Sequence, residues 1–325
     1  MGAGQINPRG INDATMLLPS SVKITAAIQT KYFKGFVITL RPIVSVSAIP
    51  WAAGLAIFAS ALYGDFPGPI FSDPEFYLKL FLIIIAAFLG VAGGYALNDY
   101  FDYEADKTNP KRLDKAVNHG YDRKTLLAYA LILGIPSMSI WFYLGIRTFT
   151  VIFVMFLCIL TYSALGKRNT PFSNLLVVVG VALMPIAVFY IYTPSITLAA
   201  VLLAVAYLFF EPGFTWSGVC RDVEGDKRLG IPTMPLKYGI PATSRLVLFT
   251  WLFVVAVSIL LFLYTELGVV FLILSTIAGL WLVILATVFV RKPTPAVGGN
   301  IFIKATLWLW IFNLALILDA VFFLQ

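Results

Sequence analysis

Long apolar stretches, each close to the length of a membrane-spanning helix, divide most of this chain. A helix needs about 20 consecutive apolar residues to cross the hydrocarbon core of a bilayer. Nine stretches approach this length, at residues 43–63, 78–98, 125–146, 150–165, 174–192, 196–219, 246–264, 267–290 and 302–324. Only 12% of the residues are charged and the mean hydropathy is +0.91, as in polytopic membrane proteins. The sequence therefore predicts an all-α membrane protein with nine transmembrane helices.

The segment before the first apolar stretch has a different character. Residues 1–35 are polar to mildly amphipathic and lack the apolar core and cleavage site of a signal peptide. We expect them to form a cytoplasmic or interfacial segment, followed by a single transmembrane domain over residues 36–325. The chain has one histidine, His119, and two cysteines, Cys158 and Cys220, which excludes a histidine-based metal site and a disulfide framework.

Basic residues are distributed unevenly between the two sides of the predicted bundle. All of the 23 Lys and Arg residues except Lys79 and Arg147 lie in the N-terminal segment or close to the connections after the even-numbered spans. Connections rich in Lys and Arg remain in the cytoplasm. We therefore expect a multi-pass protein of a prokaryotic cell membrane with a cytoplasmic N-terminus. The net charge of +7 reflects this topology and does not indicate a nucleic-acid partner.

An acidic motif follows the second apolar stretch directly. Four carboxylates lie within the eight residues 99–106. If the helix continues, Asn98, Asp102 and Asp106 recur at intervals of four residues and share one face. Carboxylates this close repel one another unless a cation lies between them. Oxygen ligands of this kind favour Mg²⁺, which is often shared with the phosphates of a substrate.

A second acidic motif follows the sixth apolar stretch and repeats the spacing with Asp222 and Asp226. A single acidic patch at a helix end is often no more than a solvated cap. Two such patches, each after a membrane-length segment and each followed by basic residues, favour a common site instead. Both lie on the predicted cytoplasmic side, so we expect the two motifs to face each other across a cavity of a single helical bundle.

Acidic side chains paired across a cavity, with Lys and Arg around them, suit a complex of Mg²⁺ with a diphosphate. The metal neutralises the carboxylates and the basic residues bind the remaining negative charge. Apolar spans around the cavity suit a long hydrocarbon tail, and aromatic rings are able to stabilise an allylic cation. The expected reaction is ionisation of a polyprenyl diphosphate and capture of the cation by a second, lipid-soluble molecule.

The two motifs together resemble those of the UbiA superfamily of intramembrane prenyltransferases. Arg41-Pro42, the segment Tyr162 to Arg168 and the segment Asp222 to Gly239 are similar to further family features. The resemblance extends from about Arg41 to the ninth span. It implies nine helices around a central cavity with a lateral opening to lipid.

The resemblance also implies roles for particular residues. Two Mg²⁺ ions are expected on Asn98, Asp102, Asp106, Asp222 and Asp226. The catalytic residues are expected to be Asp102, Asp222, Lys167 and Tyr162. The diphosphate is expected to contact Arg41, Asn98, Lys111, Arg112, Lys167, Arg168 and Lys227.

The identity of the acceptor stays open. Many members follow the first motif with Asn-x-x-x-Arg-Pro, whereas this chain has Asn109-Pro110-Lys111-Arg112, which resembles the branch that prenylates carotenoids. The second motif is closer to the ether-lipid and chlorophyll type. The expected donor is of geranylgeranyl type, and the acceptor is a quinone-precursor aromatic, geranylgeranylglyceryl phosphate, a tetrapyrrole or a carotenoid.

A cation transporter is the alternative, with the two acidic motifs as its ion pathway. Such a pathway requires acids near the middle of the membrane. Within the predicted spans only Glu211 and Asp319 meet this requirement. The motifs lie at the ends of the spans instead, which favours the transferase.

Overall fold

The computed structural model describes residues 33–64, 72–107 and 115–323, and no strand occurs among them. The predicted all-α class is confirmed. Eight helices in this part of the chain are long and apolar enough to cross a membrane. They are α2 (Pro42–Tyr63), α3 (Pro74–Phe101), α5 (Arg123–Leu144), α6 (Ile146–Thr161) with its π-helical continuation to Gly166, α10 (Leu198–Arg221), α13 (Ile240–Tyr264), α14 (Val269–Arg291) and α15 (Pro295–Phe323). The predicted segment 1–35 lies almost entirely outside the described residues.

The fifth predicted span, 174–192, folds as two short helices instead of one. They are α8 (Asn174–Ala182) and α9 (Met184–Phe189). Pro185 explains the break, because its nitrogen has no hydrogen to donate to the preceding turn. The N–H of Leu183 bonds instead to the carbonyl of Gly180, three residues back, at 3.1 Å. The nine predicted spans are thus eight long helices and one interrupted helix.

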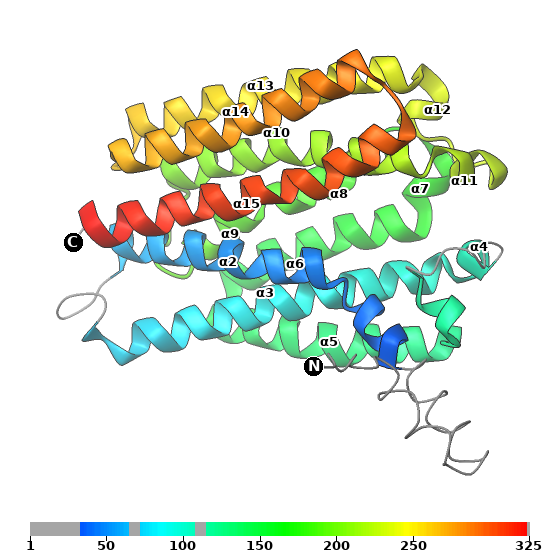
Figure 1. Cartoon of the computed structure of the whole chain (residues 1–325). Coiled ribbons are helices and arrows are strands. Elements are labelled where there is room, and N and C mark those ends of the chain that lie inside the picture. Colours follow the sequence, from blue (N-terminus) through cyan, green and yellow to red (C-terminus); the bar gives the residue numbers. More distant parts are fainter. Residues whose placement is uncertain (1–32, 65–71, 108–114, 324–325) are drawn as a thin grey trace, which may run out of the picture.

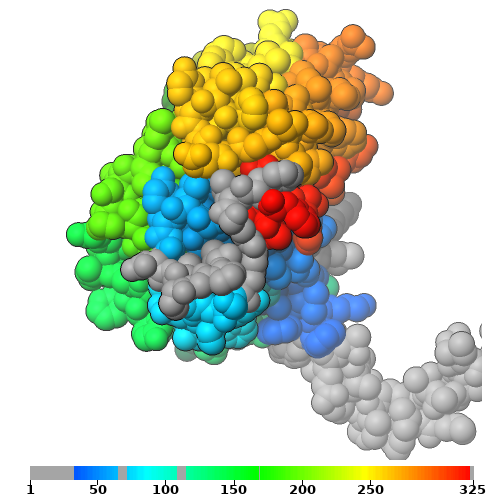
Figure 2. Space-filling model, turned by 90° about the vertical axis from the view of Figure 1, so that its left-hand side faces the viewer, coloured from blue at the N-terminus to red at the C-terminus, as the bar shows by residue number. Residues whose placement is uncertain are grey.

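The long helices lie side by side around the bundle (Figure 1). Contacts run from α2 to α3, α5, α6 and the α8–α9 pair, and continue through α10, α13 and α14 to α15, which packs on α2. Since α10 also contacts α15, α13 and α14 cover the outside of that pair. Figure 2, from the end that carries the C-terminus, shows the yellow and orange helices of the C-terminal third on one side of α2 and α3.

Four short helices gather at the opposite end of the bundle (Figure 1). They are α4 (Tyr103–Lys107), α7 (Lys167–Asn169), α11 (Val223–Arg228) and α12 (Met234–Tyr238). Helices α4 and α11 directly follow α3 and α10, the helices that end in the two acidic motifs. The fold therefore brings both motifs to the same end of the molecule, as the sequence predicts.

Small residues allow α3 and α5 to approach closely, as is common where helices associate without a hydrophobic driving force. A Cβ atom on Gly93 would lie 3.1 Å from the backbone nitrogen of Gly134, and one on Gly90 would lie 2.9 Å from Ser137 Oγ. The hydroxyl of Ser137 donates to the Ala86 carbonyl at 2.7 Å. These contacts fix one wall of the site described below.

Candidate active site

The first motif keeps its helical register although the α-helix is interrupted at Asp102. The backbone N–H of Asp102 still donates to the Asn98 carbonyl at 2.9 Å, and that of Asp106 to the Asp102 carbonyl at 2.8 Å. The side chains follow, since Asn98 Nδ2 donates to Asp102 Oδ2 at 3.1 Å. The predicted four-residue spacing therefore places Asn98 and Asp102 on one face.

The second motif repeats this arrangement at the end of α10. Asp222 separates α10 from α11, and the N–H of Asp226 donates to the Asp222 carbonyl at 3.0 Å. The guanidinium of Arg221 makes two hydrogen bonds to the Asp222 carboxylate, at 3.1 and 3.0 Å. Each motif thus ends a long helix and begins a short one.

A cavity of about 330 Å³ lies between the two motifs. Asn98 borders it from the first motif and Asp222 from the second. Tyr162 and Lys167, two further residues predicted for the site, also line it. The rest of the wall is largely apolar and comes from α2, α3, α6, α8, α10 and α15. The expectation that the two motifs face a common cavity is supported by this geometry.

Lys167 connects the two motifs electrostatically. Its ammonium lies 2.6 Å from Asp102 Oδ2. Burial lowers the pKa of Lys167, but the negative charges of Asp102 and Asp226 raise it, and together with Tyr162 they outweigh burial, so that the pKa lies above its usual value. Carboxylates from both motifs therefore act on the Lys167 ammonium, and Lys167 lines the cavity.

A second ionic cluster surrounds Asp99, which was not among the predicted site residues. The Asp99 side chain is 2% exposed, and its Oδ1 lies 3.2 Å from the Arg41 guanidinium and 3.1 Å from the Lys115 ammonium. Lys115 also contacts Asp106 at 2.8 Å. Burial raises the pKa of the Asp106 carboxyl, and Lys115 opposes this shift. Arg41 adopts a left-handed backbone conformation, with φ of 48°, which a non-glycine residue rarely does.

The donors of the two motifs fit Mg²⁺ in kind. Asn98, Asp102, Asp222 and Asp226 offer only oxygen ligands, which hard cations prefer. In the described part of the chain, however, no three acidic, histidine or cysteine side chains are close enough together to hold a metal ion. Basic groups hold the carboxylates instead: Lys167 contacts Asp102, and Arg221 contacts Asp222. Binding of a metal at this site requires these ion pairs to rearrange.

The remaining predicted residues differ in where they lie. Lys111 and Arg112 lie outside the described residues. The backbone of Arg168 belongs to α7, and its side chain is not among those described. Lys227 is exposed on α11 and lines neither cavity of the site. Their proposed contacts with a diphosphate stay predictions.

Sequence reasoning did not assign Lys115, Arg221 or Glu211 to the site. Arg221 and Glu211 line the cavity between the two motifs, which is called the central cavity from here on. Lys115 bridges Asp99 and Asp106. Glu211 carried a signal, because an acid in the middle of an apolar span is rare. Nothing in the local sequence distinguishes Lys115 or Arg221 from the other basic residues of their segments.

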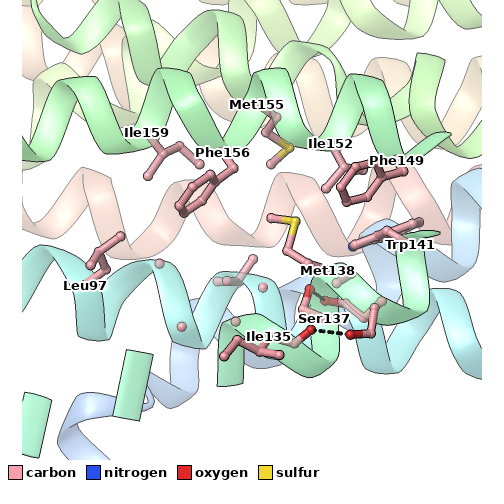
Figure 3. A pocket seen from close by; sticks show the side chains of 18 of the residues that line it. Leu97, Ile135, Ser137, Met138, Trp141, Phe149, Ile152, Met155, Phe156 and Ile159 are labelled. Carbon is pink, nitrogen blue, oxygen red and sulfur yellow. Dashed lines mark hydrogen bonds between the residues drawn. The ribbon is translucent and has the colours of Figure 1, made fainter. Parts of the chain in front are cut away.

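A larger apolar cavity of about 540 Å³ adjoins the first, between α3, α5 and α6 (Figure 3). Met138 and Trp141 from α5 face Phe149, Ile152 and Met155 from α6 across it. The two cavities share six lining residues, which are Trp51, Gly90, Val91, Gly94, Met155 and Ile159. A Cβ atom on Gly94 would meet no atom within 4 Å. The polar site and the apolar space thus adjoin at Gly90 and Gly94.

Residues 47–313, most of the chain, match the model of the UbiA prenyltransferase family. This chain belongs to that family. Members of the UbiA family are intramembrane prenyltransferases, so the protein is an enzyme of this class and a multi-pass membrane protein. The resemblance seen in the acidic motifs is confirmed.

Two kinds of UbiA relative are similar in sequence. The protoheme IX farnesyltransferase of Korarchaeum cryptofilum is 26% identical over 245 residues, covering 75% of this chain and 83% of that protein. The digeranylgeranylglyceryl phosphate synthase of Thermococcus sibiricus is 30% identical over 168 residues, covering 51% of this chain and 58% of that protein.

Solved structures of UbiA homologues share the fold. One from Aeropyrum pernix K1 has a TM-score of 0.68 at 16% identity and covers 85% of this chain and 97% of its own. A homologue from Archaeoglobus fulgidus, bound to GPP and Mg²⁺, has a TM-score of 0.60 at 15% identity, with coverage of 88% and 99%. At these identities the likeness establishes the fold of the UbiA family for this chain.

Proposed function

We propose that this UbiA protein transfers a polyprenyl group from its allylic diphosphate to a lipid-soluble acceptor in an Mg²⁺-dependent reaction. The observation that carries the proposal is one cavity bordered by both acidic motifs and by Lys167, next to a larger apolar cavity. The polar end suits a diphosphate with its cations, and the apolar space suits a hydrocarbon chain. The Mg²⁺ and GPP in the A. fulgidus homologue support the same pairing of ligands.

Asn98, Asp102, Asp222 and Asp226 would hold Mg²⁺, with Asp106 as a further ligand if Lys115 releases it. Two ions match the two motifs. When bound, Mg²⁺ supplies Lewis-acid stabilisation of the departing diphosphate.

Lys167 and Arg221 have a second role in the proposal. Each now neutralises a motif carboxylate, at 2.6 Å for Lys167 and 3.0 Å for Arg221. With Mg²⁺ held by the carboxylates, both side chains would be able to bind the oxygens of the diphosphate, and a guanidinium would do so with two parallel hydrogen bonds. Arg41 stands further back, against Asp99, and holds the beginning of α2 on the end of α3.

The apolar cavity would hold the hydrocarbon tail and exclude water. Exclusion of water matters because water would otherwise capture the allylic cation before the acceptor does. Tyr162 at the polar end and Trp51 at the junction present aromatic rings to the central cavity. These rings would stabilise positive charge that develops on the donor.

The active site is assigned to the cytoplasmic side. The short helices around the site belong to connections that are rich in Lys and Arg, and such connections remain in the cytoplasm. The donor would thus enter with its diphosphate in the aqueous phase and its tail in the bilayer. The candidate acceptors are a quinone-precursor aromatic, geranylgeranylglyceryl phosphate, a tetrapyrrole or a carotenoid.

The test uses protein purified into nanodiscs with geranylgeranyl or farnesyl diphosphate. The acceptors are geranylgeranylglyceryl phosphate, protoheme, 4-hydroxybenzoate, a naphthoate and lycopene, and the readouts are diphosphate release and product mass. We expect a product that requires Mg²⁺. Asp102→Asn and Asp222→Asn should each lower the rate at least about 100-fold, since metal stabilisation amounts to several kcal/mol.

Glu224→Gln provides the matched control, because Glu224 is exposed on α11 and lines neither cavity. It should retain the wild-type rate. Cation flux across sealed vesicles without any release of diphosphate would contradict the proposal and support the transporter instead.

A further inference from the structure

Glu211 is an acid within the membrane-spanning part of α10, and it faces the central cavity. The residue is 8% exposed. Its Oε1 accepts a hydrogen bond of 2.7 Å from Thr215 Oγ1, one helical turn further on. Among the described residues it makes no ion pair with a lysine or arginine. Ionisable groups inside a membrane protein are costly and usually serve a function.

The depth of Glu211 corresponds to the junction of the two cavities. It precedes Asp222 by eleven residues, or three helical turns, so both lie on the same face of α10, about 16 Å apart along the axis. On α3, Gly90 and Gly94 precede Asp102 by axial distances similar to the one between Glu211 and Asp222. Helix α3 ends at the same end of the bundle as α10. These glycines line both cavities. Glu211 therefore lies deeper in the bundle than the motifs, at about the level where the apolar cavity adjoins the central one.

The proposed reaction needs a proton acceptor at such a place. When the bond between the prenyl C1 and the diphosphate oxygen breaks, a new bond forms between C1 and the acceptor molecule. An acceptor that reacts through a hydroxyl group or a ring carbon bearing hydrogen, or the water that adds to an alkene acceptor, then loses one proton. The diphosphate leaves with the electron pair of the broken bond, and the proton must be taken up by a nearby base.

The motif carboxylates are poorly suited to this task. Lys167 neutralises Asp102, Lys115 neutralises Asp99 and Asp106, and Arg221 neutralises Asp222. In the proposed reaction Mg²⁺ would take the place of some of these Lys and Arg side chains, so the motif carboxylates would still be paired with a cation. Of the described residues that line the central cavity, only Glu211 and Asp222 are acids.

We propose that Glu211 is the general base that takes the proton from the acceptor. The inference rests on the proposed prenyl transfer and adds a residue to it. Thr215 is the positioning residue, because its hydrogen bond holds Oε1 of the carboxylate. An acceptor bound in the central cavity would lie between Glu211, which lines that cavity, and the prenyl C1.

The test compares Glu211→Gln with the wild type, and Glu224→Gln serves as the control at an exposed site. Three quantities are measured with the acceptor that the wild type uses: prenylated product, free prenol and diphosphate. Loss of a general base lowers a rate by about 100-fold or more. We expect product to fall by at least that factor in Glu211→Gln, while Mg²⁺-dependent diphosphate release continues and water captures the cation as prenol.

Further variants separate a base from a structural role. Glu211→Asp retains a carboxylate and should restore part of the transfer, whereas Thr215→Val should lower it less than Glu211→Gln. Donor binding and the unfolding midpoint with Mg²⁺ should match the wild type in all of them. A merely structural residue would not change the ratio of product to prenol.

The outcomes distinguish this inference from the proposed function. If the wild type transfers and Glu211→Gln transfers at the same rate, the inference alone is wrong. If Glu211→Gln loses diphosphate release as fully as product, Glu211 acts on ionisation and the assignment as base is wrong. If the wild type gives no product with any acceptor, the proposed function fails and this inference fails with it.

Discussion

At the scale of single residues, the short contact between Lys167 and Asp102 has a consequence for metal binding. The Lys167 ammonium lies 2.6 Å from Asp102 Oδ2 and so pairs with a carboxylate that we propose as a ligand of Mg²⁺. Lys167→Met removes this competitor. We expect Mg²⁺ alone to bind about ten-fold more tightly, since a hydrogen bond to a charged group contributes about 1.5–3 kcal/mol. Affinity for the diphosphate donor should fall in the same variant.

Titration of Mg²⁺ against the unfolding midpoint measures the first effect, and donor binding measures the second. Lys79→Met is the matched control, because Lys79 pairs with the exposed Glu75 at 2.7 Å at the far end of α3. It should change neither quantity. Weaker binding of Mg²⁺ to Lys167→Met would show that the lysine does not compete with the metal.

Asp99 shows the limit of sequence reasoning at this scale. The spacing of Asn98, Asp102 and Asp106 predicts one helical face, and the structure places Asn98 and Asp102 together as expected. Asp99 points to a different side, where it is buried against Arg41 and Lys115. These two partners lie 58 and 16 residues away in the chain. Contacts over such separations depend on the packing of whole helices, so the local pattern does not reveal them.

At the scale of elements, a carboxylate from α15 caps the beginning of α14. Asp319 is fully buried, and its two oxygens accept from the backbone N–H groups of Gly268 at 2.6 Å and Phe271 at 3.2 Å. Asp319→Asn replaces one acceptor by a donor and leaves one of these N–H groups unpaired. We expect the free energy of unfolding in detergent to fall by about 1–3 kcal/mol.

Prenyl transfer below the unfolding temperature should be unchanged in Asp319→Asn, because the cap lies near the C-terminal end of α15, far from the acidic motifs. Glu266→Gln, in the exposed connection before α14, is the control and should leave the unfolding midpoint in place. A large loss of activity in a stable Asp319→Asn protein would contradict a purely structural role.

How well each helix could be predicted depends on the length of its apolar stretch in the sequence. Eight apolar stretches are long enough that their helices differ from the predicted ranges mainly at the ends. The fifth stretch contains Pro185, and its apolar composition alone does not distinguish a continuous helix from the α8–α9 pair. The closure of the whole bundle around a shared cavity depends on contacts such as that of α15 with α2, which join the two ends of the chain.

At the scale of the whole molecule, the junction of the two cavities at Gly94 controls how much of the apolar space a ligand can use. Gly94→Leu is compatible with the fold, because a Cβ there meets nothing within 4 Å and leucine favours a helix. Its side chain would extend into the space beside Gly94, which both the central and the apolar cavity border. In the proposed function a long hydrocarbon tail would extend from the central into the apolar cavity, whereas a five-carbon donor would need only the central one.

We therefore expect Gly94→Leu to lower kcat/KM for geranylgeranyl diphosphate at least about ten-fold more than for dimethylallyl diphosphate, in the range that pocket fit provides. The short donor serves as the internal control, since both donors present the same diphosphate to the acidic motifs. An equal loss for both would mean that leucine disturbs the polar end. An unchanged preference would mean that the tail does not pass Gly94, and that the apolar cavity holds the acceptor instead.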